Sequence, residues 1–353
     1  MGNIQRGYFD LNKIEYLSEN DEVEENMAHY GDFLFNTRNT LLLVGKGATW
    51  FGNSDEYAFN SNIARFIFKE INTIFFNYLY NTPEVIKQVQ ARAVGTTSVA
   101  AVYPRDLNSL IFSIPTLQEQ EEIGAFFKSL DNTIALHQEN LEKLKQLKKA
   151  YLQMMFPQNG EKVPRLRFAN FYQEWEQHKL GESINFRNGR AYKQEELLDE
   201  GKYRVLRVGN FNTNDRWYYS NLELDGNKYA SQGDLLYLWA TSFGPKIWNE
   251  ETVIYHYHIW KLEIIDTNID KQYLYTYLET DKERIQQTTN GTTMFHITKG
   301  NMEEREFQYP KEITEQEKIG YIIQQLDNVT NLYYEKLEKI KKLKKFYLQS
   351  LFV

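Results

Sequence analysis

A long amphipathic segment occurs twice in this chain and constrains its fold more than any other feature. The first copy runs from Thr116 to Phe156 and opens with the capping-box pattern Thr116-Leu117-Gln118-Glu119, which satisfies free N–H groups in a first helical turn. Its apolar residues then recur at alternating spacings of four and three, so they form one stripe of a helix: Ile123, Phe127, Leu130, Ile134, Leu141, Leu144, Tyr151 and Met155. His137 and Lys148 interrupt the stripe.

The same segment returns at the end of the chain. Glu119-Gln120-Glu121 and Lys148-Lys149 recur as Glu315-Gln316-Glu317 and Lys344-Lys345, and about half of the positions aligned at this one offset are identical. The stripe recurs too: Ile319, Ile323, Leu326, Tyr333, Leu337, Ile340, Tyr347 and Leu351. One helix cannot bury such a stripe alone, so we expect the two to pack together as a coiled coil. The pattern leaves their relative direction open, and each helix could instead join a partner subunit.

Mixed α/β segments precede each helix, so the predicted order is domain, helix, domain, helix. The boundaries are 1–115 for the first domain, 116–156 for the central helix, 157–310 for the second domain and 311–353 for the C-terminal helix. The apolar runs predict strands and helices within the domains. The expected strands are 32–35, 40–44, 62–68, 203–208, 234–239 and 253–262, and the expected helices are 71–80, 83–90, 271–279 and 282–287.

The two mixed domains echo each other at a few short motifs. Gly31-Asp32 resembles Gly233-Asp234, and Gly2-Asn3 resembles Gly209-Asn210. The similarity is weak elsewhere, which indicates a tandem duplication whose helices stayed alike while its domains diverged to address different targets. The second domain carries a stretch from Trp175 to Arg207 before its Gly-Asn pair. We therefore expect the first domain to lack that opening segment, either in a shortened form or completed by another segment.

Composition excludes several classes of protein. The chain has no cysteine, which excludes disulfide frameworks and thiolate metal sites and fits a cytoplasmic protein. It has no apolar run long enough to span a membrane and no apolar core of a signal peptide near its first residues. The net charge of −7 argues against a wholly electrostatic nucleic-acid binder, but not against basic residues gathered in one groove.

Residue sets that would indicate catalysis are absent from the sequence. No Asn-Pro-Pro-aromatic or Asp-Pro-Pro-aromatic motif of a methyltransferase occurs. The stretch Gly45-Lys46-Gly47-Ala48-Thr49 lacks the spacing of a phosphate-binding loop. His256 and His258 would share one face of a strand, but the sequence places no third metal ligand beside them. We expect no catalytic residue, no metal and no cofactor.

The duplicated helix and its flanking motifs resemble the specificity subunit of Type I restriction–modification systems. The resemblance rests on 117–123 and 313–319, on the Leu-Asp pair and the lysine-rich end that follow each, and on Trp175-Glu176-Gln177-His178-Lys179-Leu180-Gly181-Glu182, which is similar to the opening of a target-recognition domain in that family. It covers nearly the whole chain. The shortened first domain departs from the pattern.

This resemblance implies a non-catalytic DNA-binding protein of α/β (α+β) class. Two mixed α/β target-recognition domains would each read half of a bipartite site in double-stranded DNA, separated by two long antiparallel helices that form a coiled coil. Methyltransferase subunits would dock on the helices, and restriction/translocase subunits would join through them.

Contacts to DNA would come from loops that follow strands. Phosphates are bound by Arg and Lys, and base edges are read by Arg, Lys, Asn, Gln, Ser and Thr. The candidates in the first domain are Arg38, Asn39, Lys46, Thr49 and Thr96. Those in the second are Arg187, Asn188, Arg190, Thr241, Ser242, Lys246, Thr292 and Thr293. Trp239 and Trp248 flank the second loop and would either stack on nucleotides or pack in the core.

Two other classes of function stay open. The acidic net charge suits a coiled-coil scaffold whose mixed domains bind proteins rather than DNA. A self-contained methyltransferase or nuclease is the third reading, and robust methyl transfer or cleavage by the isolated chain would support it.

Overall fold

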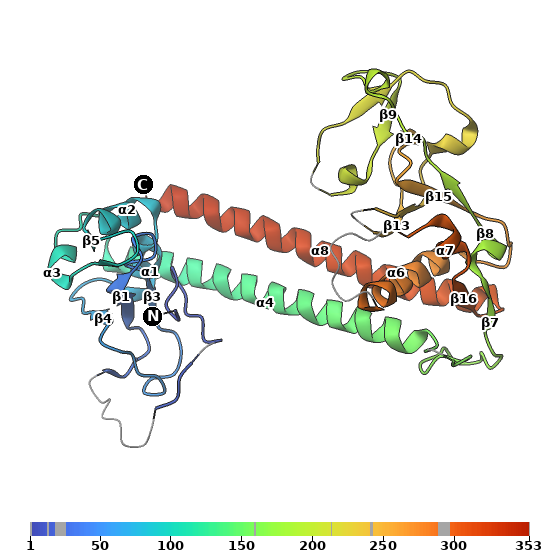
Figure 1. Ribbon diagram of the computed structural model, residues 1–353. Helices are drawn as coiled ribbons and strands as arrows, with labels where there is room; N and C mark the ends of the chain where they lie inside the picture. The colour runs from blue at the N-terminus through green and yellow to red at the C-terminus, as the bar shows by residue number, and fades with distance from the viewer. Residues whose placement is uncertain are drawn as a thin grey trace. The chain divides into compact units, whose positions relative to one another are not determined.

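Two compact units make up the protein. The computed structural model describes residues 2–12, 14–17, 26–158, 160–212, 214–240, 243–288 and 297–352. One unit combines Met1–Asn140 with Tyr333–Val353, and the other is Leu141–Leu332. We call them unit 1 and unit 2. Each contains one mixed α/β lobe and one end of both long helices, α4 (Leu117–Met155) and α8 (Ile313–Leu351) (Figure 1).

The lobe of unit 1 is built on a three-stranded antiparallel sheet in the order β3–β1–β4. A second, smaller sheet has the order β2–β6–β5. The strands are β1 (Phe33–Asn36), β2 (Arg38–Asn39), β3 (Gly47–Thr49), β4 (Ile63–Phe66), β5 (Val94–Gly95) and β6 (Ala100–Ala101). The helices are α1 (Thr73–Tyr80), α2 (Pro83–Ala91) and α3 (Pro104–Leu107).

Aromatic side chains fill the core between the first sheet of unit 1 and α1. The ring of Phe33 on β1 lies 4.9 Å from those of Phe76 and Tyr80 on α1. Asn72 begins the helix, since its side chain accepts the N–H of Phe75 at 3.0 Å, the capping expected of asparagine. This core anchors the lobe to the long helices next to it.

The long helices run antiparallel within unit 1. Phe126 on α4 meets Tyr347 on α8 with ring centroids 5.1 Å apart. Further along α4, Asp131 is ion-paired with Lys344. Numbers that rise along α4 meet numbers that fall along α8, which settles the direction and confirms the predicted packing of one helix on the other.

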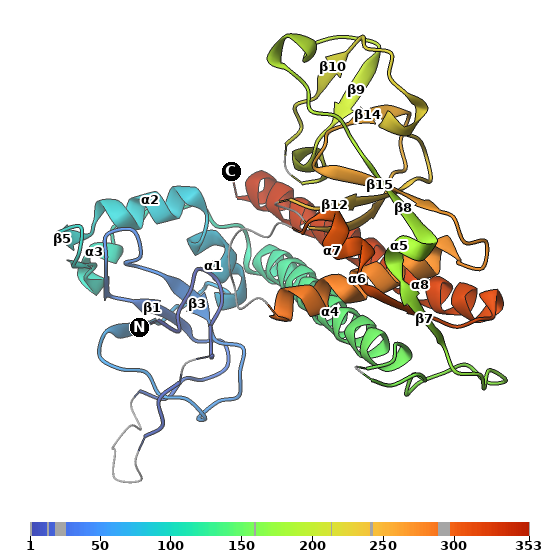
Figure 2. The same ribbon diagram turned by 45° about the vertical axis from the view of Figure 1, so that its right-hand side comes forward.

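Unit 2 contains two four-stranded sheets, in the orders β13–β12–β15–β8 and β10–β9–β14–β11, and the strand pair β16–β7 (Figure 2). The strands are β7 (Glu176–Lys179), β8 (Ile184–Asn188), β9 (Tyr203–Leu206), β10 (Tyr218–Ser220), β11 (Tyr229–Ala230), β12 (Leu235–Leu238), β13 (Gly244–Ile247), β14 (Val253–Tyr255), β15 (Ile259–Ile264) and β16 (Glu306–Tyr309). The α-helices are α5 (Leu180–Ser183), α6 (Lys271–Thr288) and α7 (Lys299–Glu303). Short 3-10 turns are η2 (Gln194–Glu196), η3 (Val208–Phe211) and η4 (Gly226–Lys228).

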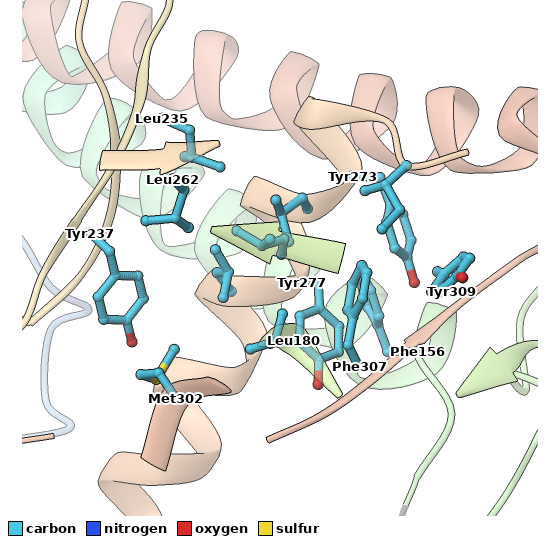
Figure 3. Packing of buried hydrophobic residues seen from close by; sticks show 14 of the residues in the cluster. Phe156, Leu180, Leu235, Tyr237, Leu262, Tyr273, Tyr277, Met302, Phe307 and Tyr309 are labelled. Carbon is cyan, nitrogen blue, oxygen red and sulfur yellow. The ribbon is translucent and has the colours of Figure 1, made fainter. Parts of the chain in front are cut away.

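Strand β12 is buried on both faces, because its side chains alternate between two cores. Leu235 and Tyr237 belong to a cluster with α6 and the ends of the long helices (Figure 3). Leu236 and Leu238 belong to a cluster shared with the β10–β9–β14–β11 sheet. The first sheet therefore lies between the helices and the second sheet.

Each long helix approaches its lobe through a repeated glycine. A Cβ atom on Gly124 would lie 2.9 Å from the backbone nitrogen of Phe75 at the start of α1, and one on Gly320 would lie 2.9 Å from that of Tyr273 at the start of α6. A side chain at either position would force the helices apart. This close contact explains why a glycine occurs at the same position of both repeats.

Four expected elements differ in the structure. Thr40–Val44 is a turn rather than a strand, with the N–H groups of Leu43 and Val44 both bonded to the carbonyl of Thr40. The strand expected over 253–262 is interrupted at 256–258 and forms β14 and β15. The helices expected at 271–279 and 282–287 are one helix, α6, since the buried Asp281 between them is ion-paired with Arg305.

Candidate nucleic-acid interface

The two Gly-Asp motifs adopt the same turn in both units. Gly31 and Gly233 have φ values of +90° and +88°, a region that favours glycine. The carboxylate of Asp32 accepts the backbone N–H of His29 at 2.9 Å. That of Asp234 accepts the N–H of Ser231 at 2.8 Å. The motif therefore shapes the entry to β1 and β12.

Each of these carboxylates also holds a cation on the neighbouring strand. Asp32 binds Nε of Arg65 at 2.9 Å, and Asp234 binds Nζ of Lys261 at 2.7 Å. Leu34 pairs with Arg65 across β1 and β4, as Leu236 pairs with Lys261 across β12 and β15. The duplication thus extends from the helices into the sheets of the lobes.

One row across the first sheet of unit 2 carries three cations on the same face. Lys246 on β13 is opposite Leu236 on β12, Leu236 is opposite Lys261 on β15, and Lys261 is opposite Arg187 on β8. At the usual strand spacing, Lys246 and Arg187 are about 14 Å apart on opposite edges of the sheet. The structure brings these two candidates onto one face without placing them in contact.

Carboxylates neutralise both candidate arginines near β8. Arg187 Nε lies 2.7 Å from Glu263. Arg190 forms two bonds with Glu196, at 2.6 and 2.8 Å, and these bonds raise the pKa of Arg190 and lower that of Glu196 to about 2. Asn188 is exposed at the end of β8, and its carbonyl accepts a bond from Lys228 at 2.8 Å.

Lys246 differs from these arginines in lacking a carboxylate. Its side chain is half-buried on β13, and within the residues that the structure describes its ammonium group has no ion pair. The positive charge of Lys246 is therefore available to bind an anion at this edge of the sheet. Phosphate oxygens of nucleic acids are among the anions that such a lysine can bind.

In unit 1, Arg38 and Asn39 on β2 belong to the same small sheet as β5, which Thr96 follows, whereas Lys46 directly precedes β3. Arg38 is exposed on β2 beside Asn39, and its guanidinium group has no ion pair among the described residues. Lys46 Nζ donates to Oε1 of Gln5 at 2.5 Å. Thr96 is exposed, and its hydroxyl lies 3.1 Å from that of Ser98.

Thr49 is unsuited to a contact with DNA. The residue is 1% exposed, and its hydroxyl donates to the carbonyl of Thr73 at 2.6 Å. Its backbone N–H donates to Asn77 at 2.9 Å. The side chain joins β3 to α1, and we leave it out of the interface. Four other candidates, Thr241, Ser242, Thr292 and Thr293, lie outside the described residues.

The two tryptophans beside the second loop pack against protein. Trp248 is 5% exposed and lies in the core shared by the two sheets of unit 2. Trp239 stacks on Trp260 with ring centroids 5.8 Å apart and donates its indole N–H to the carbonyl of Tyr257 at 2.8 Å.

Sequence reasoning missed a group of arginines around β9 and β10. The guanidinium of Arg207 lies 4.2 Å from the ring centroid of Tyr218, and that of Arg216 lies 5.0 Å from the same ring. Arg204 stacks over Trp217 at 4.5 Å. The signal was present, because basic and aromatic residues adjoin in Tyr203-Arg204 and in Arg216-Trp217-Tyr218, a composition suited to nucleic acid.

The paired histidines of unit 2 are half-buried, and their ring centroids lie 4.8 Å apart. Burial, followed by the nearby His258 and Arg207, lowers the pKa of His256 to about 4. Across the described ranges, no three His, Asp or Glu side chains gather in a way that could hold a metal ion. No described helix is long and apolar enough to cross a membrane.

Known proteins share both this sequence pattern and this fold. The Type I restriction modification DNA specificity domain matches residues 5–146 and 172–342. The MjaVIII specificity subunit of a type I restriction enzyme from Methanocaldococcus jannaschii is 21% identical over 96% of this chain and 84% of its own length. A second protein from that organism, named as the MjaX specificity subunit, is 22% identical over 97% of this chain and 83% of its own.

Solved structures agree on the fold. A crystal structure of the specificity subunit of a type I restriction–modification system from M. genitalium superposes with a TM-score of 0.61 at 17% identity, over 93% of this chain and 84% of its own. A structure from work on complex assembly and conformational transition of the type I system gives 0.54 at 19% identity, over 92% and 82%. The family match spans most of the chain, so this protein belongs to the type I restriction–modification specificity family.

Proposed function

We propose that this protein is the non-catalytic subunit that reads a bipartite site in double-stranded DNA for a type I restriction–modification complex. The lobe of each unit would read one half of the site. The paired helices would set the spacing between the halves. Family membership supports DNA recognition in general. The reading of one half-site by each lobe goes beyond family membership and is part of the proposal.

The observation that best supports two matched DNA-reading lobes is an ion pair between α4 and α8 that occurs once in each unit. In unit 2, Lys148 Nζ lies 2.6 Å from Asp327. In unit 1, Lys344 is paired with Asp131. Lys148 and Lys344 are equivalent in the repeat, and so are Asp131 and Asp327. The same repeat positions are therefore paired in each unit, and polar pairs between helices can fix the register of a coiled coil.

The proposed DNA surface consists of the exposed or half-buried candidates from both lobes. Free cations would contact phosphates, and arginines held by carboxylates or aromatic rings would be fixed in place for base edges. In unit 1 these residues are Arg38, Asn39, Lys46 and Thr96. In unit 2 they are Arg187, Asn188, Arg190, Lys246, Arg207 and Arg216.

The methyltransferase and restriction subunits would be recruited by the helices. Large apolar side chains remain exposed on α4 and α8 in both units. Tyr334 and Phe346 of unit 1 are 59% and 61% exposed, and Tyr321 and Leu332 of unit 2 are 62% and 64% exposed. Aromatic residues are enriched at protein interfaces, which supports a protein partner on these helices.

The decisive experiment begins with co-expression of this chain and its methyltransferase subunit, followed by mapping of the methylated adenines. The two half-sites found in this way are then placed in duplexes whose spacer is lengthened or shortened one base pair at a time. Duplexes with one half-site scrambled are the control. We expect binding only near one spacer length. Affinity that ignored changes of more than a base pair or two would contradict the proposal.

A further inference from the structure

One continuous segment of unit 2, residues 164–179, covers the junction of its lobe with both helices. Arg167 binds Glu315 on α8 through two bonds of 2.7 and 2.9 Å. Trp175 packs on Phe156, the residue after α4, with ring centroids 6.1 Å apart. Strand β7 then pairs along the whole of β16. The segment thus has three anchors: an arginine, a tryptophan and a strand.

Each of the three anchor points in unit 2 has an equivalent residue or stretch in unit 1, which the sequence repeat identifies. Glu119 is equivalent to Glu315, and Phe352 is equivalent to Phe156. The counterpart of β16 is the stretch 111–114. Its position is fixed because Gln120 donates to the carbonyl of Pro115 at 3.0 Å, as Gln316 donates to that of Pro310 at 2.8 Å.

No described residue covers these counterparts in the way that 164–179 covers the sites of unit 2. Glu315 is 1% exposed, whereas Glu119 is exposed. Phe156 is 2% exposed, whereas Phe352 is half-buried against Phe75 and Phe127 at 5.4 and 5.7 Å.

The stretch 111–114 is extended and belongs to no strand pair. Ile111 is 80% exposed. Its N–H and carbonyl bond to the side chain of Gln88, while the N–H groups of Phe112 to Ile114 have no partner in the described part of the chain. Such an edge can accept an added strand.

We propose that unit 1 carries a docking site for a segment of a separate polypeptide that repeats the chemistry of 164–179. This occupant would place an arginine on Glu119, an aromatic ring on Phe352 and a β-strand along 111–114. The matching sites in unit 2 are filled by the chain itself, and they define both the spacing and the order of these anchors.

One residue differs between the two sites, and it indicates the charge that the bound segment should have. In unit 2, Lys318 lies 4.9 Å from the ring centroid of Phe171. The residue equivalent to Lys318 in unit 1 is Glu122, which is exposed. A lysine or arginine in place of Phe171 would pair with that carboxylate. The site in unit 1 therefore favours a more basic segment than the one that fills unit 2.

A labelled peptide with the sequence of residues 160–179 tests the site on the full chain by fluorescence anisotropy. We expect saturable binding that Glu119→Gln weakens about tenfold, since a hydrogen-bonded ion pair is lost. Glu121→Gln removes the same charge from an exposed neighbouring position and should leave the affinity unchanged. Arg167→Ala within the peptide should weaken binding to the wild-type chain but add nothing to Glu119→Gln. Phe171→Lys within the peptide should tighten binding.

Both helix substitutions lie at exposed positions, and an unchanged circular dichroism spectrum would verify their folding. Absence of saturable binding overturns the proposal, as does binding that Glu119→Gln leaves intact. So does a homodimer in which a second copy of the chain fills the site with its own 164–179 segment. None of these measurements involves DNA, so their result is independent of the proposed function.

Discussion

His137 and Tyr333 occupy equivalent positions in the two repeats, and their rings meet each other, with centroids 5.4 Å apart and planes at 65°. Within unit 1, this contact aligns one position of the first repeat with the same position of the second. The pairing of Asp131 with Lys344 in unit 1 and of Asp327 with Lys148 in unit 2 obeys the same relation. The sequence repeat is therefore matched by the same pairing of helix positions within each unit.

Replacing His137 should stabilise the protein. The residue is 8% exposed, and its Nδ1 has no hydrogen-bond partner among the described residues. His137→Leu would remove this unsatisfied nitrogen and restore the apolar stripe, which should raise the free energy of unfolding by about 1 kcal/mol. Urea unfolding followed by circular dichroism measures the change. His137→Asn keeps a polar group at this position and is the control; equal stability of the two variants would contradict this account.

The ion pair between Arg167 and Glu315 should contribute far more to stability than the equivalent position of the first repeat. Their side chains are 12% and 1% exposed. Glu315→Ala leaves a buried guanidinium without its partner and should lower the free energy of unfolding by about 3–5 kcal/mol. Glu119→Ala is the matched control, because it makes the same change at the exposed equivalent position, and should cost less than about 0.5 kcal/mol. Similar losses in the two variants would show that the pair is not the cause.

The repeated helix and the Gly-Asp motifs could be predicted from sequence because their signals are local. A stripe spaced by three and four residues specifies a helix wherever it packs. The residue pattern alone left the relative direction of α4 and α8 open, and only the family resemblance predicted it, since that direction depends on pairs such as Lys148–Asp327, which are far apart in the chain. Leu41 to Leu43 are apolar enough for a strand, yet they form an exposed turn, because no neighbouring strand pairs with them.

The candidate DNA contacts were harder to predict for the same reason. Whether an arginine is free depends on distant residues, and Glu263, which neutralises Arg187, lies on another strand. Thr49 follows a loop in the sequence but is bonded to Thr73 in the core. Arg216 is two residues from Tyr218 in the chain, but only the pairing of β9 with β10 brings Arg207 to the same ring.

Stability should fall in mild acid because of His256. Its pKa is lowered from 6.5 to about 4 in the folded protein, chiefly by burial. The unfolded chain binds a proton near pH 6.5 that the folded protein does not bind until about pH 4, so the contribution of this residue is present above pH 6.5 and is lost as the pH falls between these values.

Urea midpoints at pH 7 and pH 5 measure this effect. The wild-type midpoint should drop more between the two values than that of His256→Asn, which cannot take up the proton. His178→Asn, at a side chain that is 40% exposed, should keep the wild-type dependence. Equal drops in the wild type and His256→Asn would assign the acid sensitivity to other groups.

Lys246 tests the proposed DNA surface most directly, because its ammonium group has no ion pair in the described part of the chain and its removal should leave the fold intact. Lys246→Ala should weaken binding of the complex to its DNA site, and the slope of log Kd against log salt concentration should fall by about 1, as expected for one lost phosphate contact. Titrations at several salt concentrations measure both. Lys311→Ala, at a side chain that is 68% exposed beside Glu176, removes the same charge elsewhere in unit 2 and should change neither quantity. An unaltered slope for Lys246→Ala would remove this edge of the sheet from the interface.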